Sequence, residues 1–148
     1  MKVSKKGTDL IKKFEGCRLH AYYCPAGVCT IGYGHTLGVR PGDTITQKQA
    51  EDLLLQDLVR FENEVMKYDH LYHFNQNEFD ALVSFAYNIG TLTGVTRSGQ
   101  RSKKQISEKM LLYVKAAGAT LPGLVRRRQA EHDLFVTPVS KRKSKKDT

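Results

Sequence analysis

The sequence predicts a mainly helical α+β fold, with a small N-terminal β-hairpin lobe joined by a long helix to a helical lobe. Apolar residues recur at helical spacing over most of the chain. Short runs rich in Tyr, Val, Ile and Thr, which are typical of strands, occur only between about residues 18 and 46. Capping-box patterns at residues 46–49 and 75–78 mark the starts of two further helices. We therefore expect strands only in the 18–46 segment.

The first helix is expected to begin at Ser4, a residue type that caps helix N-termini. Leu10 and Phe14 lie on its apolar face, and Gly16, which easily adopts a left-handed turn, is expected to end it. This arrangement places Glu15 in the last turn.

The next segments are expected to form a hairpin and then a connecting helix. Residues 18–34 contain two strand-like runs around Pro25-Ala26-Gly27, which indicates a β-hairpin followed by a glycine-containing loop. From Thr46, a mainly apolar stripe continues for about twenty residues. A helix of this length can bridge two lobes.

The second half of the chain is expected to be helical. A helix from Asn75 to Gly90 is apolar around much of its circumference, which indicates a central, buried position. Residues 91–104 are expected to form a polar connection, and residues 106–117 a helix that ends at Gly118. A last helix follows Pro122, with its inward face formed by Leu124, Val125, Leu134 and Phe135.

We expect one domain over residues 1–136, with the β-lobe at about 18–46 and the helical lobe formed by about 68–136 together with the N-terminal helix. Residues 137–148 are expected to form a basic, disordered tail. The cleft between two such lobes is a common place for a substrate.

Composition and charge limit the classes of binding partner to be considered. The 148 residues include 24 Lys and Arg against 15 Asp and Glu, a net charge of +9, which favours a polyanion such as nucleic acid, an anionic membrane or a bacterial wall polymer. Nucleic acid is not expected, because the basic residues lack an aromatic platform or zinc-finger spacing. No apolar run is long enough for stable membrane insertion, and residues 1–14 lack the pattern of a secretory signal. We therefore expect synthesis in a cytoplasm.

The three cysteines, Cys17, Cys24 and Cys29, fall within thirteen residues and are odd in number, so a disulfide framework is not expected. Whether two of them pair remains open. Cys17 and Cys29 match no catalytic position and are expected to be inert. No metal-ligand spacing occurs, and we expect no metal and no cofactor.

Glu15 is the first candidate for chemistry. A carboxylate in the last turn of a helix faces the negative end of the helix dipole, which costs about 0.3–1 kcal/mol at an exposed site. This field, together with partial burial beside Phe14, would favour the protonated carboxyl that a general acid needs. The alternative is an exposed Glu15 compensated by Lys12 or Arg18.

The surrounding residues read FEGCRLHAYYCPAGVCTIGYGHT, in which eight residues separate Glu15 from Cys24 and five separate Cys24 from Thr30. This segment resembles the phage-type lysozymes of glycoside hydrolase family 24, which include the T4-like and lambdoid endolysins. The resemblance extends through NQNEFDALVSFAYNIG at 75–90 and LPGLVRRRQAE at 121–131. Three motifs in the same order are far more specific than one.

The resemblance implies an endolysin that hydrolyses the β-1,4 bond between N-acetylmuramic acid and N-acetylglucosamine in peptidoglycan and so lyses the cell. Glu15 would be the general acid, and Thr30 would help to hold the attacking water. The enzyme would be made in the cytoplasm, as a monomer, and would reach the wall after release by a separate membrane-permeabilising protein of the holin type.

Cys24 departs from the T4-like pattern, in which an Asp at this place can act as the base for water. A thiol with the ordinary pKa near 8.5 is a poorer base at neutral pH, although a nearby cation can lower that pKa. A thiolate can also attack carbon and form a covalent intermediate. Inversion and retention at the anomeric carbon both remain open.

The resemblance also implies substrate-binding positions at Tyr87, Asn88 and Ser98. Packing in the core is an equal alternative for Tyr87. His35 is a further candidate, although a structural role, closing the β-lobe by pairing with a carboxylate such as Asp69, is favoured. One of the two arginines that follow Leu124 by three and four residues, at positions 127 and 128, is expected to pair with Glu15 across the cleft.

Two other classes of protein stay open. A cysteine amidase or peptidase of the wall would use Cys24 as nucleophile and His35 as base. An inactive wall-binding relative would explain the missing Asp and the positive charge. A solvated basic face is the default for the remaining arginines.

Overall fold

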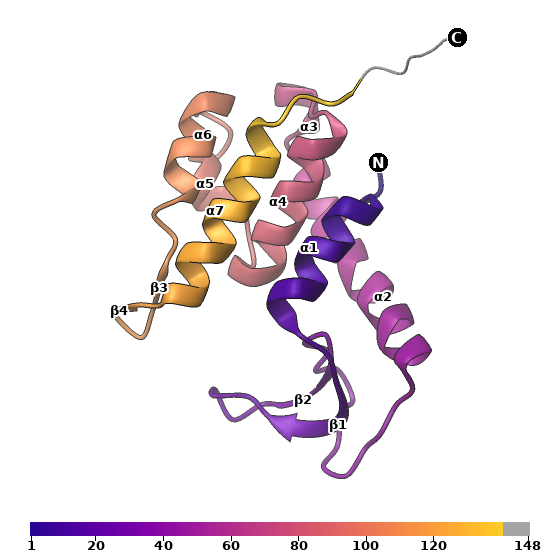
Figure 1. Cartoon of the computed structure of the whole chain (residues 1–148). Helices are drawn as coiled ribbons and strands as arrows, with labels where there is room; N and C mark the ends of the chain where they lie inside the picture. The colour runs from indigo at the N-terminus through magenta and orange to yellow at the C-terminus, as the bar shows by residue number, and fades with distance from the viewer. Residues whose placement is uncertain (141–148) are drawn as a thin grey trace, which may run out of the picture.

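Helix α1 (Lys5–Glu15) opens the chain in a computed structural model that describes residues 1–140 (Figure 1). Ser4 occupies the N-cap position as expected, but its side chain does not cap its own helix. Its hydroxyl and its backbone N–H instead donate to the carboxylate of Asp80, which anchors the start of α1 to another helix. Gly16 takes a φ of 68° and ends α1, so the expected bounds of this helix are confirmed.

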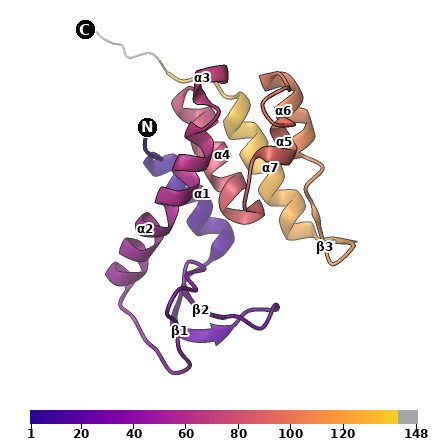
Figure 2. The same cartoon turned by 180° about the vertical axis from the view of Figure 1, so that it is seen from behind.

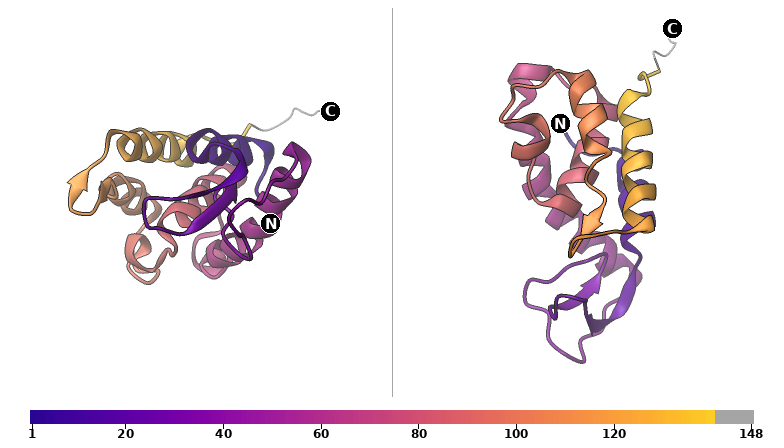
Figure 3. Two further views of the ribbon diagram at one scale, coloured as in Figure 1. Left: turned by 90° about the horizontal axis from the view of Figure 1, so that it is seen from below. Right: turned by 90° about the vertical axis from the view of Figure 1, so that its left-hand side faces the viewer.

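The expected β-hairpin follows. Strands β1 (Arg18–Tyr23) and β2 (Cys29–Gly32) pair antiparallel, with Tyr22 opposite Thr30. The turn is closed by the backbone N–H of Cys24, which donates to the carbonyl of Val28 at 2.9 Å. This small sheet lies at one end of the molecule, beyond the ends of the helices (Figure 3).

Helix α2 (Gln47–Met66) leads from the β-hairpin lobe to the helical lobe (Figure 2). Thr46 and Gln49 form the expected capping box, in which each side chain accepts from the other residue's backbone N–H. The prediction of a twenty-residue connecting helix is therefore confirmed.

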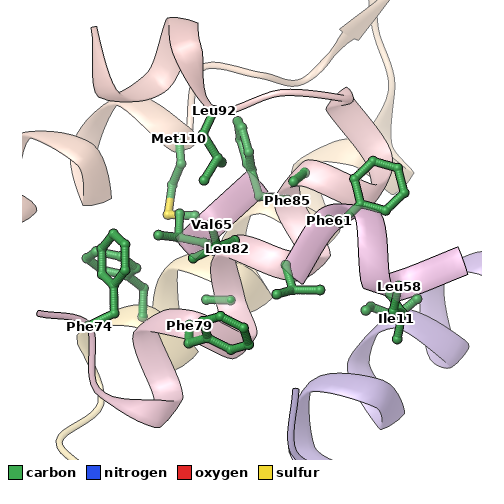
Figure 4. Packing of buried hydrophobic residues seen from close by; sticks show 14 of the residues in the cluster. Ile11, Leu58, Phe61, Val65, Phe74, Phe79, Leu82, Phe85, Leu92 and Met110 are labelled. Atoms are coloured by element: carbon green, nitrogen blue, oxygen red, sulfur yellow. The ribbon is translucent and has the colours of Figure 1, made fainter. Parts of the chain in front are cut away.

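The helical lobe is built around α4 (Gln76–Ile89), which α1, α2 and α7 (Pro122–Val136) contact. Every residue from Asn77 to Ala86 is buried, which confirms the expected central position of this helix. Its capping box joins Asn75 and Glu78. Side chains from α1, α2 and α4 meet those of α6 (Lys103–Met110) in one hydrophobic core (Figure 4).

Three expectations for residues 106–120 were wrong. Strands β3 (Lys115–Ala116) and β4 (Ala119–Thr120) form a second hairpin outside residues 18–46. Its two turn residues, Ala117 and Gly118, both have positive φ, the geometry of a tight two-residue hairpin, so Gly118 turns a hairpin instead of ending a helix. Helix α6 accordingly ends at Met110.

The connection at 91–104 contains the short helix α5 (Thr93–Thr96), because Leu92 and Val95 are buried and draw this segment onto the core. A further single turn, α3 (Asp69–Tyr72), follows α2. In α7, Phe135 is buried as expected, but Val125 is 44% exposed.

Residues 137–140, the start of the expected tail, follow α7 without helix or strand, but Asn77 Nδ2 donates to the carbonyl of Thr137 at 2.9 Å, so the expected disorder is wrong at this residue. Residues 141–148 lie outside the described part of the chain. Among residues 1–140, no helix is both long and apolar enough to cross a bilayer.

Candidate active site

Glu15 lies where the two lobes meet. Its side chain, 20% exposed, accepts a hydrogen bond of 2.6 Å from Nη1 of Arg127, whose own side chain is 4% exposed. The prediction that an arginine of the 127–128 pair contacts Glu15 is therefore confirmed, with Arg127 as the partner. The expected compensation of an exposed Glu15 by Lys12 or Arg18 is replaced by this buried arginine.

A cavity of about 660 Å³ opens beside Glu15. The β-lobe supplies residues 34–37 to its wall, and α2 and α4 supply the remainder. Among the side chains from α2 and α4 are Gln56, Asp57, Arg60, Phe61, Tyr87 and Asn88. The cavity therefore lies between the lobes, as expected for a substrate cleft, and it combines polar groups with aromatic surface.

Gly34 brings the β-lobe backbone against Glu15. Its φ of 96° favours glycine, and a Cβ at this position would lie 3.2 Å from Oε1 of Glu15 and 3.5 Å from the Tyr87 hydroxyl. The absence of a side chain at Gly34 thus lets the loop after β2 approach the carboxylate closely.

Tyr87 has a structural contact at the site. Its hydroxyl donates to the backbone carbonyl of Tyr33 at 2.7 Å, and its ring packs edge-on against Phe61. Burial raises the pKa of Tyr87 strongly, with the negative charge of Glu15 adding to the effect. The hydroxyl therefore stays protonated and serves as a donor, while part of the residue still lines the cavity.

His35 lines the cavity but pairs with a different carboxylate from the one expected. Its Nδ1 lies 2.8 Å from Oδ2 of Asp57, and its Nε2 lies 2.9 Å from the carbonyl of Leu37. The expected partner, Asp69, instead accepts from the backbone N–H of Phe74. Asp57 lies twelve residues before Asp69 in the chain. It is therefore closer to His35, because α2 leads away from the β-lobe with a rise of about 1.5 Å per residue.

Cys24 and Thr30 flank the turn of the first hairpin and are brought together there, although neither lines the cavity beside Glu15. Thr30 is buried, and its hydroxyl donates to the carbonyl of Val28 at 2.8 Å. Backbone N–H groups of Val28 and Ala26 lower the pKa of the half-buried Cys24 thiol, and the Thr30 hydroxyl contributes to the same effect. The thiolate is thus stabilised by hydrogen-bond donors of the hairpin turn.

The two remaining predicted binding residues lie in different places. Asn88 lines the main cavity and also a second one of about 570 Å³, and Glu15 likewise lines both. The second cavity has a basic rim that includes Lys13 and Arg126. Ser98 lines neither cavity: it follows α5 with a φ of 54°, and its backbone N–H donates to the carbonyl of Thr93 at 2.9 Å.

All three cysteines are free thiols. Within residues 1–140, no group of three or more His, Cys, Asp and Glu side chains is placed to hold a metal ion.

Sequence reasoning missed a buried group behind Glu15. Arg128 and Glu131 are fully buried, which agrees with the expected inward position of Arg128, but no partner for Arg128 and no role for Glu131 were expected. Both arginines reach Glu131 from positions three and four residues earlier on α7. That spacing is the signal that could have identified the group, because residues three or four apart share one face of a helix.

Comparison with known proteins shows which family the chain belongs to. The family model described as phage lysozyme matches residues 12–131, which include Glu15, both candidate hairpin residues and the arginine that contacts Glu15. The chain belongs to the phage lysozyme family. It is similar to the endolysin of Acyrthosiphon pisum secondary endosymbiont phage 1, at 40% identity over 91% of this chain and 98% of that protein.

Two more family comparisons differ in coverage. The endolysin of Lactococcus phage c2 is 46% identical over 95% of this chain, which spans only 62% of that relative's length. The solved muramidase domain of SpmX from Asticaccaulis excentricus is 38% identical, with a TM-score of 0.79, over 93% of this chain and 99% of the domain. The phage lysozyme fold, with its two lobes and helical core, is therefore shared over nearly the full described chain.

Proposed function

We propose that this phage lysozyme family member is an endolysin of the lysozyme type. It hydrolyses the β-1,4 glycosidic bond between N-acetylmuramic acid and N-acetylglucosamine in bacterial peptidoglycan and thereby lyses cells. One observation carries the proposal: a carboxyl group, Glu15, projects into the cavity between the lobes, where the β-lobe backbone at Gly34 and the side chains of α2 and α4 surround it. The names of the similar proteins, two endolysins and a muramidase domain, support it.

Glu15 acts as the general acid in this proposal. It donates its proton to the glycosidic oxygen while the C1–O bond breaks and the sugar ring acquires oxocarbenium character. Partial burial keeps water from competing for that proton, and the hydrogen bond from Arg127 fixes the carboxyl orientation.

Cys24 and Thr30 take part in the attack on C1, opposite the leaving oxygen that Glu15 protonates. This role requires a substrate that extends from the cavity to the turn of the first hairpin. In an inverting course, the Cys24 thiolate takes one proton from the water that attacks C1, and the Thr30 oxygen accepts a hydrogen bond from that water while its own proton stays on the Val28 carbonyl. In a retaining course, the sulfur of Cys24 attacks C1 itself, and water then cleaves the resulting thioglycoside with Glu15 as base. The lowered pKa of Cys24 serves both courses, and the anomeric form of the first product, observed by NMR, distinguishes them.

His35, Tyr87 and Asn88 contribute to substrate binding by shaping the cavity, and Ser98 would contact sugar only if the glycan extended along the helical lobe past α5. With a net charge of +9, the chain is attracted to anionic wall polymers. We further propose that the enzyme works as a monomer, made in the cytoplasm and released to the wall through a membrane lesion formed by another protein.

The bond that is cleaved tests the proposal. Purified peptidoglycan treated with the full chain should yield new reducing sugar ends in step with clearing of the suspension. New amino groups without reducing ends would indicate an amidase or peptidase. Binding to the wall with neither product would indicate an inactive relative.

A further inference from the structure

Four charged residues form a buried cluster behind the cavity, which we call the charge cluster: Glu15, Arg127, Arg128 and Glu131. The side chains of Arg128 and Glu131 are 0% exposed and that of Arg127 is 4% exposed, whereas Glu15 retains 20%. Two positive and two negative charges therefore balance within the cluster, and Glu15 is the member that faces the cavity.

Glu131 is the centre of this cluster. Its Oε2 accepts from Ser84 Oγ at 2.5 Å, from Arg127 Nε at 3.1 Å and from Arg128 Nη2 at 3.2 Å. Its Oε1 lies 2.7 Å from Arg128 Nε, a close ion pair whose angle is poor for a hydrogen bond. Donors from α4 and α7 thus hold this carboxylate in place.

Each nitrogen of the Arg127 guanidinium has a partner. Nε donates to Glu131, Nη2 donates to the carbonyl of Ser84 at 3.1 Å, and Nη1 donates to Glu15. The partners of Nε and Nη2 are buried groups that do not line the main cavity. Glu131 and the Ser84 carbonyl therefore fix the plane of the guanidinium independently of Glu15.

We propose that Glu131 is a positioning residue: it holds the Arg127 guanidinium against Glu15 and balances part of its positive charge, so that Glu15 can take up a proton between turnovers. An arginine without a second carboxylate would favour the ionised form of Glu15 more strongly, because opposite charges stabilise each other in a partly buried site. The inference rests on the proposed function, in which Glu15 must carry a proton.

Other charged or titratable groups surround Glu15 but are not altered by a change at Glu131. Tyr87 approaches it from α4, and Lys13 lies two residues before it on α1. The remaining groups around the two cavities are His35 in the β-lobe, Asp57 and Arg60 on α2, and Arg126 on α7. A displaced pH dependence in a Glu131 variant therefore reports on the charge cluster.

The test is the pH profile of Glu131→Gln, which keeps the size of the side chain and removes its charge. On solubilised peptidoglycan strands at low concentration, the alkaline limb of kcat/KM, where the acid loses its proton, should move to lower pH by about one unit. The matched control is Asp80→Asn, which also removes a fully buried charge but contacts Ser4 and Gln76 instead of the charge cluster. An unmoved limb in Glu131→Gln, or an equal movement in both variants, would overturn the proposal.

A second measurement needs neither activity nor the folding of a Glu131 variant. In the Glu15→Gln protein, the Nε–Hε group of Arg127, followed by ¹⁵N NMR, should remain sharp and slow to exchange with water, because Glu131 and Ser84 still hold it. Loss of that signal would show that Glu15 orders Arg127 and would overturn the positioning role. Persistence of the signal in Glu15→Gln, together with a parent protein that releases no reducing ends, would refute the proposed function alone.

Discussion

The hydroxyl of Tyr87 donates a 2.7 Å hydrogen bond to the backbone carbonyl of Tyr33 and ties the central helix of the helical lobe to the loop that follows β2. The next residue, Gly34, lies against Glu15. Because Tyr33 is the chain neighbour of Gly34, the hydrogen bond from Tyr87 also fixes how closely the β-lobe approaches Glu15. The contact was not expected from the sequence, which suggested a sugar-binding or packing role for Tyr87.

Tyr87→Phe should therefore reduce both stability and activity. The change leaves the Tyr33 carbonyl without its donor, at a cost of about 1–3 kcal/mol in the free energy of unfolding. Urea unfolding and clearing of purified walls measure the two effects. Tyr72→Phe is the matched control, since the Tyr72 hydroxyl also donates to a backbone carbonyl, that of Arg101 at 2.6 Å, but lies away from the cavity. Equal activity in the two variants, at equal folded fraction, would contradict the role of Tyr87 in the site.

Gly34→Ala should lose activity beyond what its effect on folding explains. The added Cβ would lie 3.2 Å from Glu15 Oε1, so either the carboxyl or the loop must move. Gly42→Ala provides the comparison, because Gly42 also has a positive φ, 89°, but has open space where the Cβ would be placed. Both variants carry backbone strain of about 1 kcal/mol, and only Gly34→Ala should slow wall clearing strongly. Parallel losses would refute the steric explanation.

The thiol of Cys24 should react at lower pH than an ordinary cysteine. Its lowered pKa means that the thiolate is already populated below the pH range in which an unperturbed thiol ionises. Alkylation with iodoacetamide at pH 7, mapped by mass spectrometry, should modify Cys24 ahead of Cys17 and Cys29, which are also only partly buried. If all three thiols were alkylated at the same rate, the backbone N–H groups of the turn would not activate Cys24.

Substitutions at Cys24 address its place in catalysis. Cys24→Asp should retain wall clearing, because a carboxylate can also serve as base or nucleophile, whereas Cys24→Ala should lower the rate by about 10²-fold or more. A peptidase with Cys24 as its nucleophile would instead lose all turnover in both variants. Reducing-end assays on the two proteins distinguish these results.

Much of the fold could be predicted from the sequence because its signals are local. The Thr46 and Asn75 capping boxes, the hairpin turn at Gly27 and the helix end at Gly16 each depend on residues close together in the chain. The second hairpin escaped prediction because its turn, Ala117-Gly118, also matches the end of a helix.

The long-range parts of the site could be predicted only in part. An arginine contact for Glu15 was expected, since Arg127 and Arg128 fall on the inward face of α7, but the buried acceptor Glu131 was not. The choice of Asp57 over Asp69 for His35 depends on how far α2 carries each carboxylate from the β-lobe, which its sequence pattern alone did not reveal. The resemblance to a family placed Ser98 among the binding residues, whereas the chain folds it into the loop after α5.

Glu15→Gln tests the central claim most directly. The change keeps the side chain's size and its ability to accept from Arg127, but removes the proton that a general acid donates. Release of reducing ends from purified peptidoglycan should fall by about 10²–10⁴-fold while a cooperative thermal transition persists. Glu108→Gln, which alters an exposed acid paired with Lys104 on α6, should keep the parent rate. A well-folded Glu15→Gln protein that releases reducing ends as fast as the parent would contradict the account.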